Sequence, residues 1–290
     1  MYYIIVNKCV LKRKSNVKKL NSVKAVFDSA GIEYTVRLSE SKESARTIAA
    51  EITSGSGNSV IVMGGDGTLH DVLNGFVNFE NNRLGLIPLG TGNDFAKAAG
   101  IPVNVKKAAE IIVADKTRKI DFIELNSGLR SINAVGAGID VDVLKRAYAG
   151  KNTKKSKYLF ALISSLIHFE SYEYTVEYDG VDEKHFGLIG AVGNGKQIGG
   201  GIKVFPEAEI DDGYLDLLVV DYISKIKIIG AFIRLMLGKI NAIKQVTAVK
   251  TKAVKFIPRK SYTIQADGEL YDDTPLEAHI CEGKLNFYMK

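Results

Sequence analysis

The sequence VIVMGGDGTLHDVLNG, at residues 60–75, decides the fold of the first half of this 290-residue chain. It begins with an apolar run typical of a buried strand, turns at three glycines and ends in a pattern typical of a helix. Glycines at a strand end let a bulky anion approach the backbone, and the first turn of a helix offers free N–H groups to phosphate. The stretch therefore predicts an anion-binding strand–turn–helix unit. The alternative is an ordinary turn in which Thr68 caps the helix.

Two polar residues of this stretch bear on its chemistry. Asp66 lies among the glycines, where a carboxylate beside phosphates is repelled unless a divalent cation or a proton mediates. Asp66 therefore predicts either Mg²⁺ or a hydrogen-bond network in the site. His70 is the one histidine of four that lies near this proposed chemistry. Its alternative is an exposed position in the first helical turn.

A second glycine loop, LIPLGTGNDFA at residues 86–96, repeats the arrangement one strand–helix unit later. Its Thr91 and Asn93 can bond phosphate or cap the following helix. Two neighbouring glycine loops can jointly surround a triphosphate, which favours a nucleotide site. Neither loop is followed by Gly-Lys-Ser/Thr, so neither is a Walker-type P-loop, and no G-x-G-x-x-G opens the first helix.

The first half of the chain alternates short apolar runs with helical patterns. This rhythm predicts a Rossmann-like nucleotide-binding α/β domain over residues 1–125, with a mostly parallel sheet whose ligands bind at the carboxyl ends of its strands. Strands are expected at 3–6, 34–38, 60–63 and 84–88, and helices at about 14–30, 41–52, 68–77 and 93–114.

The second half has closely spaced β-type runs separated by Gly and Asp turns. It predicts an antiparallel β-sandwich over residues 126–290, with the option that the last residues return to the first domain. A cleft between two unlike domains is the expected active site. Strands are expected at 172–178, 186–192, 215–220, 254–257 and 262–266, and helical insertions at about 155–169 and 223–240.

Composition narrows the class of protein. A formal charge of +6 favours an anionic partner, but no nucleic-acid-binding signature is present, so no nucleic acid is expected. The most apolar later segment is too short for the roughly 20 residues that a bilayer span needs. Cys9 and Cys281 have no metal-ligand spacing and predict no disulfide framework, which suits a soluble protein of the reducing cytoplasm.

Several further blocks join the two loops in a resemblance that spans nearly the whole chain. Read together, they closely resemble the bacterial soluble diacylglycerol kinase-like lipid kinases. The first loop alone would equally suit the wider superfamily of sphingosine kinases, NAD kinases and 6-phosphofructokinases, and the later blocks narrow it to lipid kinases. These blocks are NAVGAGID at 133–140, GNGKQIGGG at 193–201, PEAEIDDGYLD at 206–216 and DGE at 267–269.

The resemblance implies ATP as phosphoryl donor, Mg²⁺, and peripheral contact with the inner membrane surface. The ATP contacts that the loops and the resemblance imply are Asn7, Ser39, Gly64, Gly65, Asp66, Gly67, Thr68, Leu69, His70, Asp71, Thr91 and Asn93. The backbone carbonyls of Glu209 and Tyr214 and the side chain of Asp212 are similar to the family's structural Mg²⁺ site; a plain turn at Asp212 is the alternative. A homodimer is expected from the resemblance alone.

Phosphoryl transfer needs alignment, charge neutralisation and removal of the hydroxyl proton. Asp66, Asp267 and Glu269 are the candidate catalytic residues. Asp267 and Glu269 match the family's acidic pair, and either can be the general base; a simple Asp-Gly turn is the alternative. One departure concerns the segment after Asn7, which lacks the Pro and small turn residue usual in the family; Lys8 or Lys12 is a candidate for the lost contacts.

The segment 223–240 carries an apolar stripe flanked by basic residues. Such a helix can lie on a membrane, but packing of the stripe on its own domain is the favoured interpretation. The basic stretch 151–157 is read as a solvated loop that could also draw the chain to anionic lipid.

The leading hypothesis is transfer of the ATP γ-phosphate to the hydroxyl of diacylglycerol or a related membrane lipid, giving a phosphatidic-acid-type product. One alternative is a kinase of a sphingoid base, phosphatidylglycerol or a soluble metabolite. A second is a non-catalytic nucleotide- or lipid-binding regulator.

Overall fold

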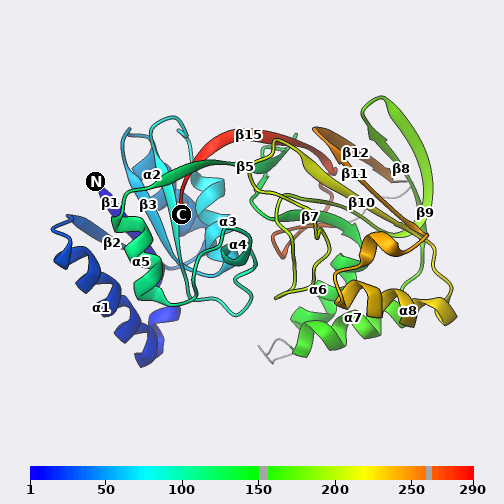
Figure 1. Cartoon of the computed structure of the whole chain (residues 1–290), viewed down its shortest axis with the longest axis horizontal. Helices are drawn as coiled ribbons and strands as arrows, with labels where there is room; N and C mark the ends of the chain where they lie inside the picture. Colours follow the sequence, from blue (N-terminus) through cyan, green and yellow to red (C-terminus); the bar gives the residue numbers. More distant parts are fainter. Residues whose placement is uncertain (150–155, 259–262) are drawn as a thin grey trace. The chain divides into compact units, whose positions relative to one another are not determined.

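The computed structural model describes residues 1–149, 156–258 and 263–290 (Figure 1). The basic stretch 151–157 and the strand expected at 262–266 therefore lie partly outside the described residues. The chain divides into two compact units. Unit 1 holds Met1–Asp121 and Glu282–Lys290, and unit 2 holds Phe122–Cys281. Two long strands, β5 (Thr117–Leu125) and β15 (Glu277–Tyr288), each have residues in both units.

Unit 1 is built on the predicted parallel sheet, with strand order β15-β4-β3-β1-β2. Every residue of β3 is buried, as expected of a central parallel strand covered on both faces. Helix α1 packs beside α5, and α2 packs beside α3. The strands are β1 (Tyr2–Asn7), β2 (Tyr34–Ser39), β3 (Ser59–Gly64) and β4 (Arg83–Pro88). The helices are η1 (Val10–Lys12), α1 (Lys14–Ser29), α2 (Lys42–Thr53), α3 (Asp66–Gly75), α4 (Asp94–Ala98) and α5 (Val105–Val113).

The single helix expected over 93–114 is wrong, because this segment forms two helices. Gly100 lies just beyond α4 with φ +65, a backbone conformation that ends a helix readily. Pro102 follows and cannot continue the helical hydrogen bonding. Asn104 then starts α5, since its side chain accepts the N–H groups of Lys106 and Lys107.

Unit 2 contains the predicted antiparallel strands. The long strand β9 (Val181–Gly193) pairs with β8 (Tyr172–Tyr178) along its first half, and with β7 (Ala134–Gly138) and β10 (Leu215–Asp221) along its second half. The remaining strands are β6 (Arg130–Ser131), β11 (Val246–Thr251), β12 (Ala253–Pro258), β13 (Ile264–Ala266) and β14 (Glu269–Tyr271). The helices are α6 (Ile139–Ala149), α7 (Ser156–His168), α8 (Lys225–Met236) and η2 (Ile240–Ala242).

Two apolar clusters form the core of unit 2. Successive residues of β10 alternate between them: Leu217 and Val219 join one cluster, and Leu218 and Val220 join the other. This alternation follows from the two-residue repeat of a strand. The first cluster is made by strands, whereas the second also takes in the buried side of α8.

Helix α6 falls in a segment for which no element is predicted from the sequence. The expectation about the packing of α8 is wrong. The apolar stripe of α8 does not pack on its own domain. Ile228 and Ala231 are buried instead, whereas Ile226 and Ile229 point to solvent.

Candidate active site

The two glycine loops meet at the carboxyl ends of the parallel strands. They follow β3 and β4, which pair up to Gly64 and Pro88, so both loops start at neighbouring carboxyl ends. The N–H of Leu89 donates to the carbonyl of Gly64 at 2.7 Å. A Cβ atom at Gly65 would lie 3.0 Å from the Cα of Gly90, and one at Gly90 would lie 2.7 Å from the Cα of Gly65. The loops therefore touch backbone to backbone, and neither glycine has room for a side chain.

Helix α3 begins directly at the first loop. Gly65 is its N-cap and Asp66 its first residue, so the alternative that Thr68 caps the helix is wrong. Gly65, Asp66, Gly67 and Thr68 are all partly accessible. The first turn of α3 thus offers accessible backbone N–H groups at the carboxyl ends of the strands.

Asp66 links the two loops. Its Oδ1 accepts the backbone N–H of Phe95, in α4, at 3.2 Å. The carboxylate is therefore part of a hydrogen-bond network, one of the two arrangements that its position among glycines predicted.

Asn93 is held in a left-handed backbone conformation with φ 49. Its amide nitrogen donates to the carbonyl of Gly90 at 2.8 Å, while its Oδ1 is buried without a hydrogen-bond partner. Thr91, between them, is exposed. The second loop therefore presents an exposed hydroxyl beside a fixed amide, as a polar ligand site requires.

The rest of the first motif is buried. Leu69 and His70 are fully buried and Asp71 is nearly so. The alternative that His70 is exposed is therefore wrong: its Nε2 lies 3.4 Å from the amide of Asn74. Asp71 faces Arg46 of α2 across 3.5 Å. These side chains brace α3, and the accessible part of the motif lies at residues 65–68.

Asn7 and Ser39 end β1 and β2, where they pair with each other. Both predicted ATP contacts therefore lie at the carboxyl ends of the same sheet as the glycine loops. Asn7 Oδ1 accepts the N–H of Cys9 at 2.8 Å, and the buried hydroxyl of Ser39 has no hydrogen-bond partner. In the altered segment after Asn7, exposed Lys8 forms a 2.7 Å ion pair with Glu40.

Asp267, in unit 2, is saturated by backbone and hydroxyl donors. It has φ 50 in the turn between β13 and β14. Its Oδ1 accepts Ser131 Oγ at 2.6 Å and the N–H groups of Asn133 and Ala134 at 2.9 and 3.2 Å. Its Oδ2 accepts the N–H of Ile132 at 3.0 Å. Four donors therefore fix this carboxylate against the segment before β7.

Glu269 is the first residue of β14 and pairs with Ala266 across the turn. It is partly accessible. The turn itself is pinned by Asp267 and by the N–H of Gly268, which donates to the side chain of Gln265 at 3.0 Å. The hydrogen bonds to Asp267 therefore also hold Glu269 in place, because both residues belong to the same turn.

Asp140, in the first turn of α6, was not recognised as a candidate. Burial raises the pKa of its carboxyl to about 7, and both carboxylate oxygens are buried without a hydrogen-bond partner. A Cβ atom at Gly136 would lie 2.1 Å from Asp140 Oδ2. The signal in the sequence was the block at 133–140, which places a carboxylate after three small residues.

The residues of the expected Mg²⁺ site lie in an acidic group with a lysine. Asp212 Oδ1 accepts the N–H of Tyr214 at 3.0 Å, and its Oδ2 contacts Lys250. Lys250 also lies 3.5 Å from Asp216, whose pKa is raised by burial and by Asp212 while Lys250 opposes the shift. The oxygen donors fit a hard cation such as Mg²⁺, and Lys250 already supplies one positive charge to them. Sequence reasoning missed Lys250, because it is 38 residues from Asp212.

The diacylglycerol kinase catalytic domain family matches residues 1–125, and the YegS C-terminal NAD kinase beta sandwich-like domain matches residues 133–289. The chain belongs to the bacterial diacylglycerol kinase-like lipid kinase family. It is accordingly a lipid-kinase-like phosphotransferase, which argues against the non-catalytic alternative. The predicted α/β and β-sandwich fold classes are confirmed.

Individual relatives of this kinase agree with that assignment. It is 30% identical over 217 residues to "Probable lipid kinase YegS" of Escherichia fergusonii, covering 71% of each chain. It is 28% identical over 256 residues to the diacylglycerol kinase of Bacillus subtilis, covering 87% of this chain and 84% of the relative. A crystal structure of a diacylglycerol kinase from Bacillus anthracis matches with a TM-score of 0.79 and 25% identity, covering 100% of this chain and 96% of the other.

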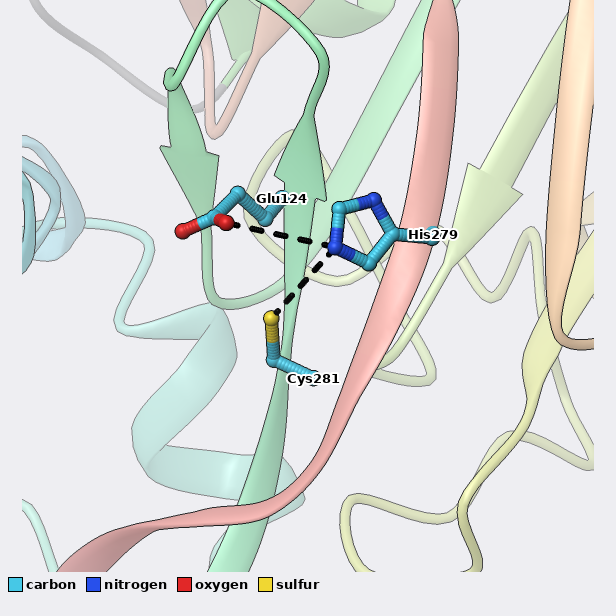
Figure 2. A group of neighbouring side chains, drawn as sticks. All are labelled: Glu124, His279 and Cys281. Atoms are coloured by element: carbon cyan, nitrogen blue, oxygen red, sulfur yellow. Dashed lines mark hydrogen bonds and ion pairs between the residues drawn. The ribbon is translucent and has the colours of Figure 1, made fainter.

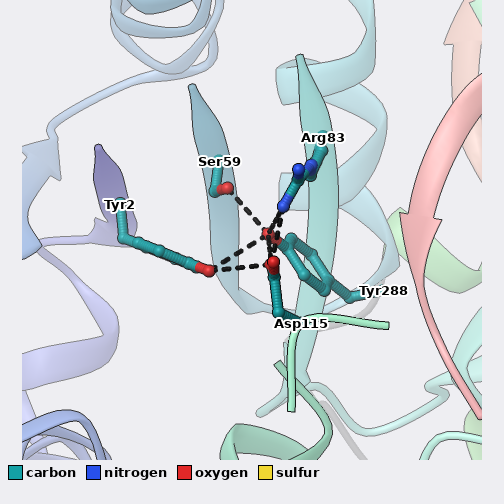
Figure 3. A network of polar contacts seen from close by, with 5 residues as sticks. All are labelled: Tyr2, Ser59, Arg83, Asp115 and Tyr288. Carbon is teal, nitrogen blue, oxygen red and sulfur yellow. Dashed lines mark hydrogen bonds and ion pairs between the residues drawn. The ribbon is translucent and has the colours of Figure 1, made fainter. Parts of the chain in front are cut away.

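A separate polar network lies at the amino ends of the kinase's parallel strands (Figure 3). The hydroxyl of Tyr288 lies 2.8 Å from Ser59 Oγ and donates to Asp115 at 3.1 Å. Arg83 also contacts Asp115, at 2.6 Å, and Tyr2 donates to it at 2.9 Å. Tyr2, Ser59 and Arg83 are the first residues of their strands. The network therefore ties the end of β15 into unit 1, away from the glycine loops.

A second group of neighbouring side chains, Glu124, His279 and Cys281, contains metal-ligand types other than oxygen (Figure 2). In unit 2 the Nε2 atom of His279 lies 3.9 Å from Glu124 and 3.8 Å from the sulfur of Cys281. A thiol and an imidazole suit a borderline cation such as Zn²⁺ better than Mg²⁺. Glu124 also accepts Arg130 at 2.8 Å. This group is therefore no candidate for the Mg²⁺ of phosphoryl transfer.

Proposed function

We propose that this kinase transfers the γ-phosphate of ATP to the hydroxyl of diacylglycerol or a related membrane lipid. The observation that carries the proposal is the backbone contact of two glycine loops at the carboxyl ends of β3 and β4, beside the first turn of α3. Glycines carry no side chain that would keep a phosphate away from the backbone, and helix N–H groups favour its charge. Membership of a kinase family makes ATP the natural phosphoryl donor.

Different residues of the site contact different parts of the nucleotide in this proposal. Backbone groups of residues 65–68 hold phosphate oxygens, and Thr91 and Asn93 add polar contacts from the second loop. Asn7 and Ser39 bind the nucleotide from the ends of β1 and β2. Asp66 keeps the two loops in register through Phe95, so its loss weakens both at once.

The transfer step requires a base. The lipid hydroxyl oxygen attacks the γ-phosphorus, the bond from that phosphorus to the β–γ bridging oxygen breaks, and ADP leaves. The hydroxyl proton passes to Glu269. We assign this role to Glu269 rather than Asp267, because four donors already occupy the oxygens of Asp267. Asp267 is a positioning residue that holds the turn on which Glu269 lies.

Mg²⁺ enters the proposal at two places. With ATP it would neutralise phosphate charge, which is the chemistry that this ion supplies to kinases. Asp212, with the backbone carbonyls of Glu209 and Tyr214, would hold a structural ion in unit 2. Asp216 and Lys250 set the charge around that position.

A labelling experiment tests the proposal. The purified chain is incubated with ATP radiolabelled at the γ-phosphate, Mg²⁺, and either extracted membrane lipids or a pool of soluble metabolites. We expect label in the lipid fraction, on a phosphatidic-acid-type product. Label found only in the aqueous fraction would defeat the lipid assignment and leave a kinase of a soluble acceptor.

A further inference from the structure

Helix α8 exposes an apolar stripe to solvent. Ile226 is 92% exposed, Ile229 67% and Ile233 53%, and Leu237, just beyond the helix, is 66% exposed. Their spacing of three to four residues places them on one face of the helix. A row of four large aliphatic side chains in water is unusual for a soluble surface, where such residues are normally scattered singly.

The side of α8 opposite the stripe is buried, which keeps the stripe facing solvent. Ile228, Ala231 and, partly, Leu235 pack into the apolar cluster that also contains Leu218 and Val220 of β10. Turning the stripe inward would expose these residues instead. The exposed face of α8 is therefore a stable feature of unit 2.

Other exposed apolar side chains belong to segments packed on the same cluster. Tyr222, directly before α8, is 53% exposed and lies against half-exposed Phe186, with ring centroids 6.0 Å apart. Phe160 of α7 is 71% exposed, while Leu166 of the same helix packs on the cluster. Aromatic side chains of this kind favour the boundary between water and lipid headgroups.

The charge around the stripe selects its partner. The charged residues on α8 and directly after it are Lys225, Lys227, Arg234 and Lys239, and residues 222–240 contain no Asp or Glu. A second copy of the same face would meet like charges, whereas anionic headgroups would be attracted.

We propose that the exposed face of α8 docks this kinase on an anionic lipid bilayer, with the apolar stripe entering the headgroup boundary. Lys225, Lys227 and Arg234 then contact the headgroups beside it. The inference rests on the proposed function in one respect: a lipid acceptor has to be reached from a bilayer surface. With 12 residues α8 is far below the roughly 20 that a span needs, so it lies in the plane of the interface. Among the described residues, no helix combines the length and apolarity required to cross a membrane.

Vesicle sedimentation without ATP tests the docking alone. The full chain is mixed with vesicles of phosphatidylcholine, or of phosphatidylcholine with phosphatidylglycerol. Wild type should bind the anionic vesicles at least about ten-fold more tightly, because several Lys and Arg side chains lie near the stripe. Ile226→Ser with Ile229→Ser should lower that affinity at least about ten-fold, because two large aliphatic side chains no longer enter the lipid.

The matched control is Val77→Ser with Val103→Ser, which removes two exposed aliphatic side chains from unit 1. It should bind vesicles as wild type does. All variants should keep the wild-type melting temperature, since each substituted residue is exposed. Equal vesicle binding by the α8 variant and wild type would overturn the proposal. So would a wild-type dimer that the α8 substitutions dissociate while vesicle binding is retained, because the face would then be a subunit interface.

Activity separates this proposal from the proposed function. The α8 variant should phosphorylate detergent-dispersed diacylglycerol at the wild-type rate and vesicle-borne diacylglycerol more slowly. If wild type binds anionic vesicles but phosphorylates no lipid in either form, the lipid kinase assignment fails and the docking face stands.

Discussion

The carboxylate of Asp267 accepts the backbone N–H of Asn133 at 2.9 Å, across 134 residues of sequence. Ser131, Ile132 and Ala134 donate to the same carboxylate, so one side chain fastens the β13–β14 turn to the start of β7. This contact separates two acidic residues that the sequence left equivalent. Asp267 holds the turn, and Glu269 is the residue that we propose as the base.

Glu269→Gln should reduce turnover with little effect on folding. Loss of a general base typically lowers the rate by about 10² to 10⁴. Because Glu269 is only partly buried, the free energy of unfolding should change by less than about 0.5 kcal/mol. Steady-state kinetics and thermal unfolding of the same preparation check both statements. A fully active Glu269→Gln variant would exclude this residue as the base.

Asp267→Asn should instead destabilise unit 2. The substitution removes a charged acceptor from four donors, which should cost at least about 2 kcal/mol of unfolding free energy. Urea unfolding measures this cost. An unchanged midpoint together with lost activity would show that Asp267, rather than Glu269, acts directly in the reaction.

Gly65→Ala should weaken nucleotide binding. The added methyl group would lie 3.0 Å from Gly90 Cα and must push the two loops apart. We expect ATP affinity to fall at least about ten-fold, or about 1.4 kcal/mol, as measured by calorimetry with a non-hydrolysable analogue. The control is Gly230→Ala in α8, where the nearest atom is 3.7 Å away. It should stabilise the chain by about 0.5 to 1 kcal/mol without changing nucleotide affinity. Equal affinity in both variants would contradict the site.

Asp140→Asn should stabilise the chain most at alkaline pH. Folded Asp140 keeps its proton up to about pH 7, because burial raises its pKa, whereas the unfolded chain loses it near the ordinary value of 3.8. The unfolded state therefore binds fewer protons between these two values, and stability falls as pH rises through this window. Asn cannot ionise, so its advantage should grow from pH 4 to about pH 7 and reach up to about 4 kcal/mol. An advantage that does not vary with pH would contradict the raised pKa.

Tyr288→Phe should destabilise unit 1 while leaving the chemistry intact. The lost hydroxyl leaves buried Ser59 and the Asp115 carboxylate with one contact fewer, at a cost of about 1 to 3 kcal/mol. The melting temperature should fall, and turnover below the unfolding transition should match wild type. Lost turnover with an unchanged melting temperature would place this network in the active site.

Sequence reasoning found the elements whose patterns are local. The strand expected at 172–178 matches β8, and the two glycine loops fall at neighbouring strand ends as predicted. It was wrong where tertiary contacts decide. His70 is buried because α3 packs on its neighbours, and the stripe of α8 faces out because Ile228 occupies the core. Helix periodicity identifies an apolar face but not the surface that covers it.

For the candidate site, too, the local motifs were predicted from the sequence and the long-range contacts were not. Residue types and spacing indicated the glycine loops, whereas the acidic turn was indicated by the resemblance to the lipid kinases. The partners of Asp267 and Asp212 could not be inferred. Ser131 and Lys250 are brought to them by pairing of strands far apart in sequence, at separations of 136 and 38 residues.

The central claim is tested most directly by following the γ-phosphate of ATP onto diacylglycerol presented in anionic vesicles, with wild type and Glu269→Gln side by side. Wild type should yield labelled phosphatidic acid, and the variant should yield it about 10² to 10⁴ times more slowly. Absence of labelled lipid with the folded wild-type chain, or equal rates for both proteins, would contradict the account.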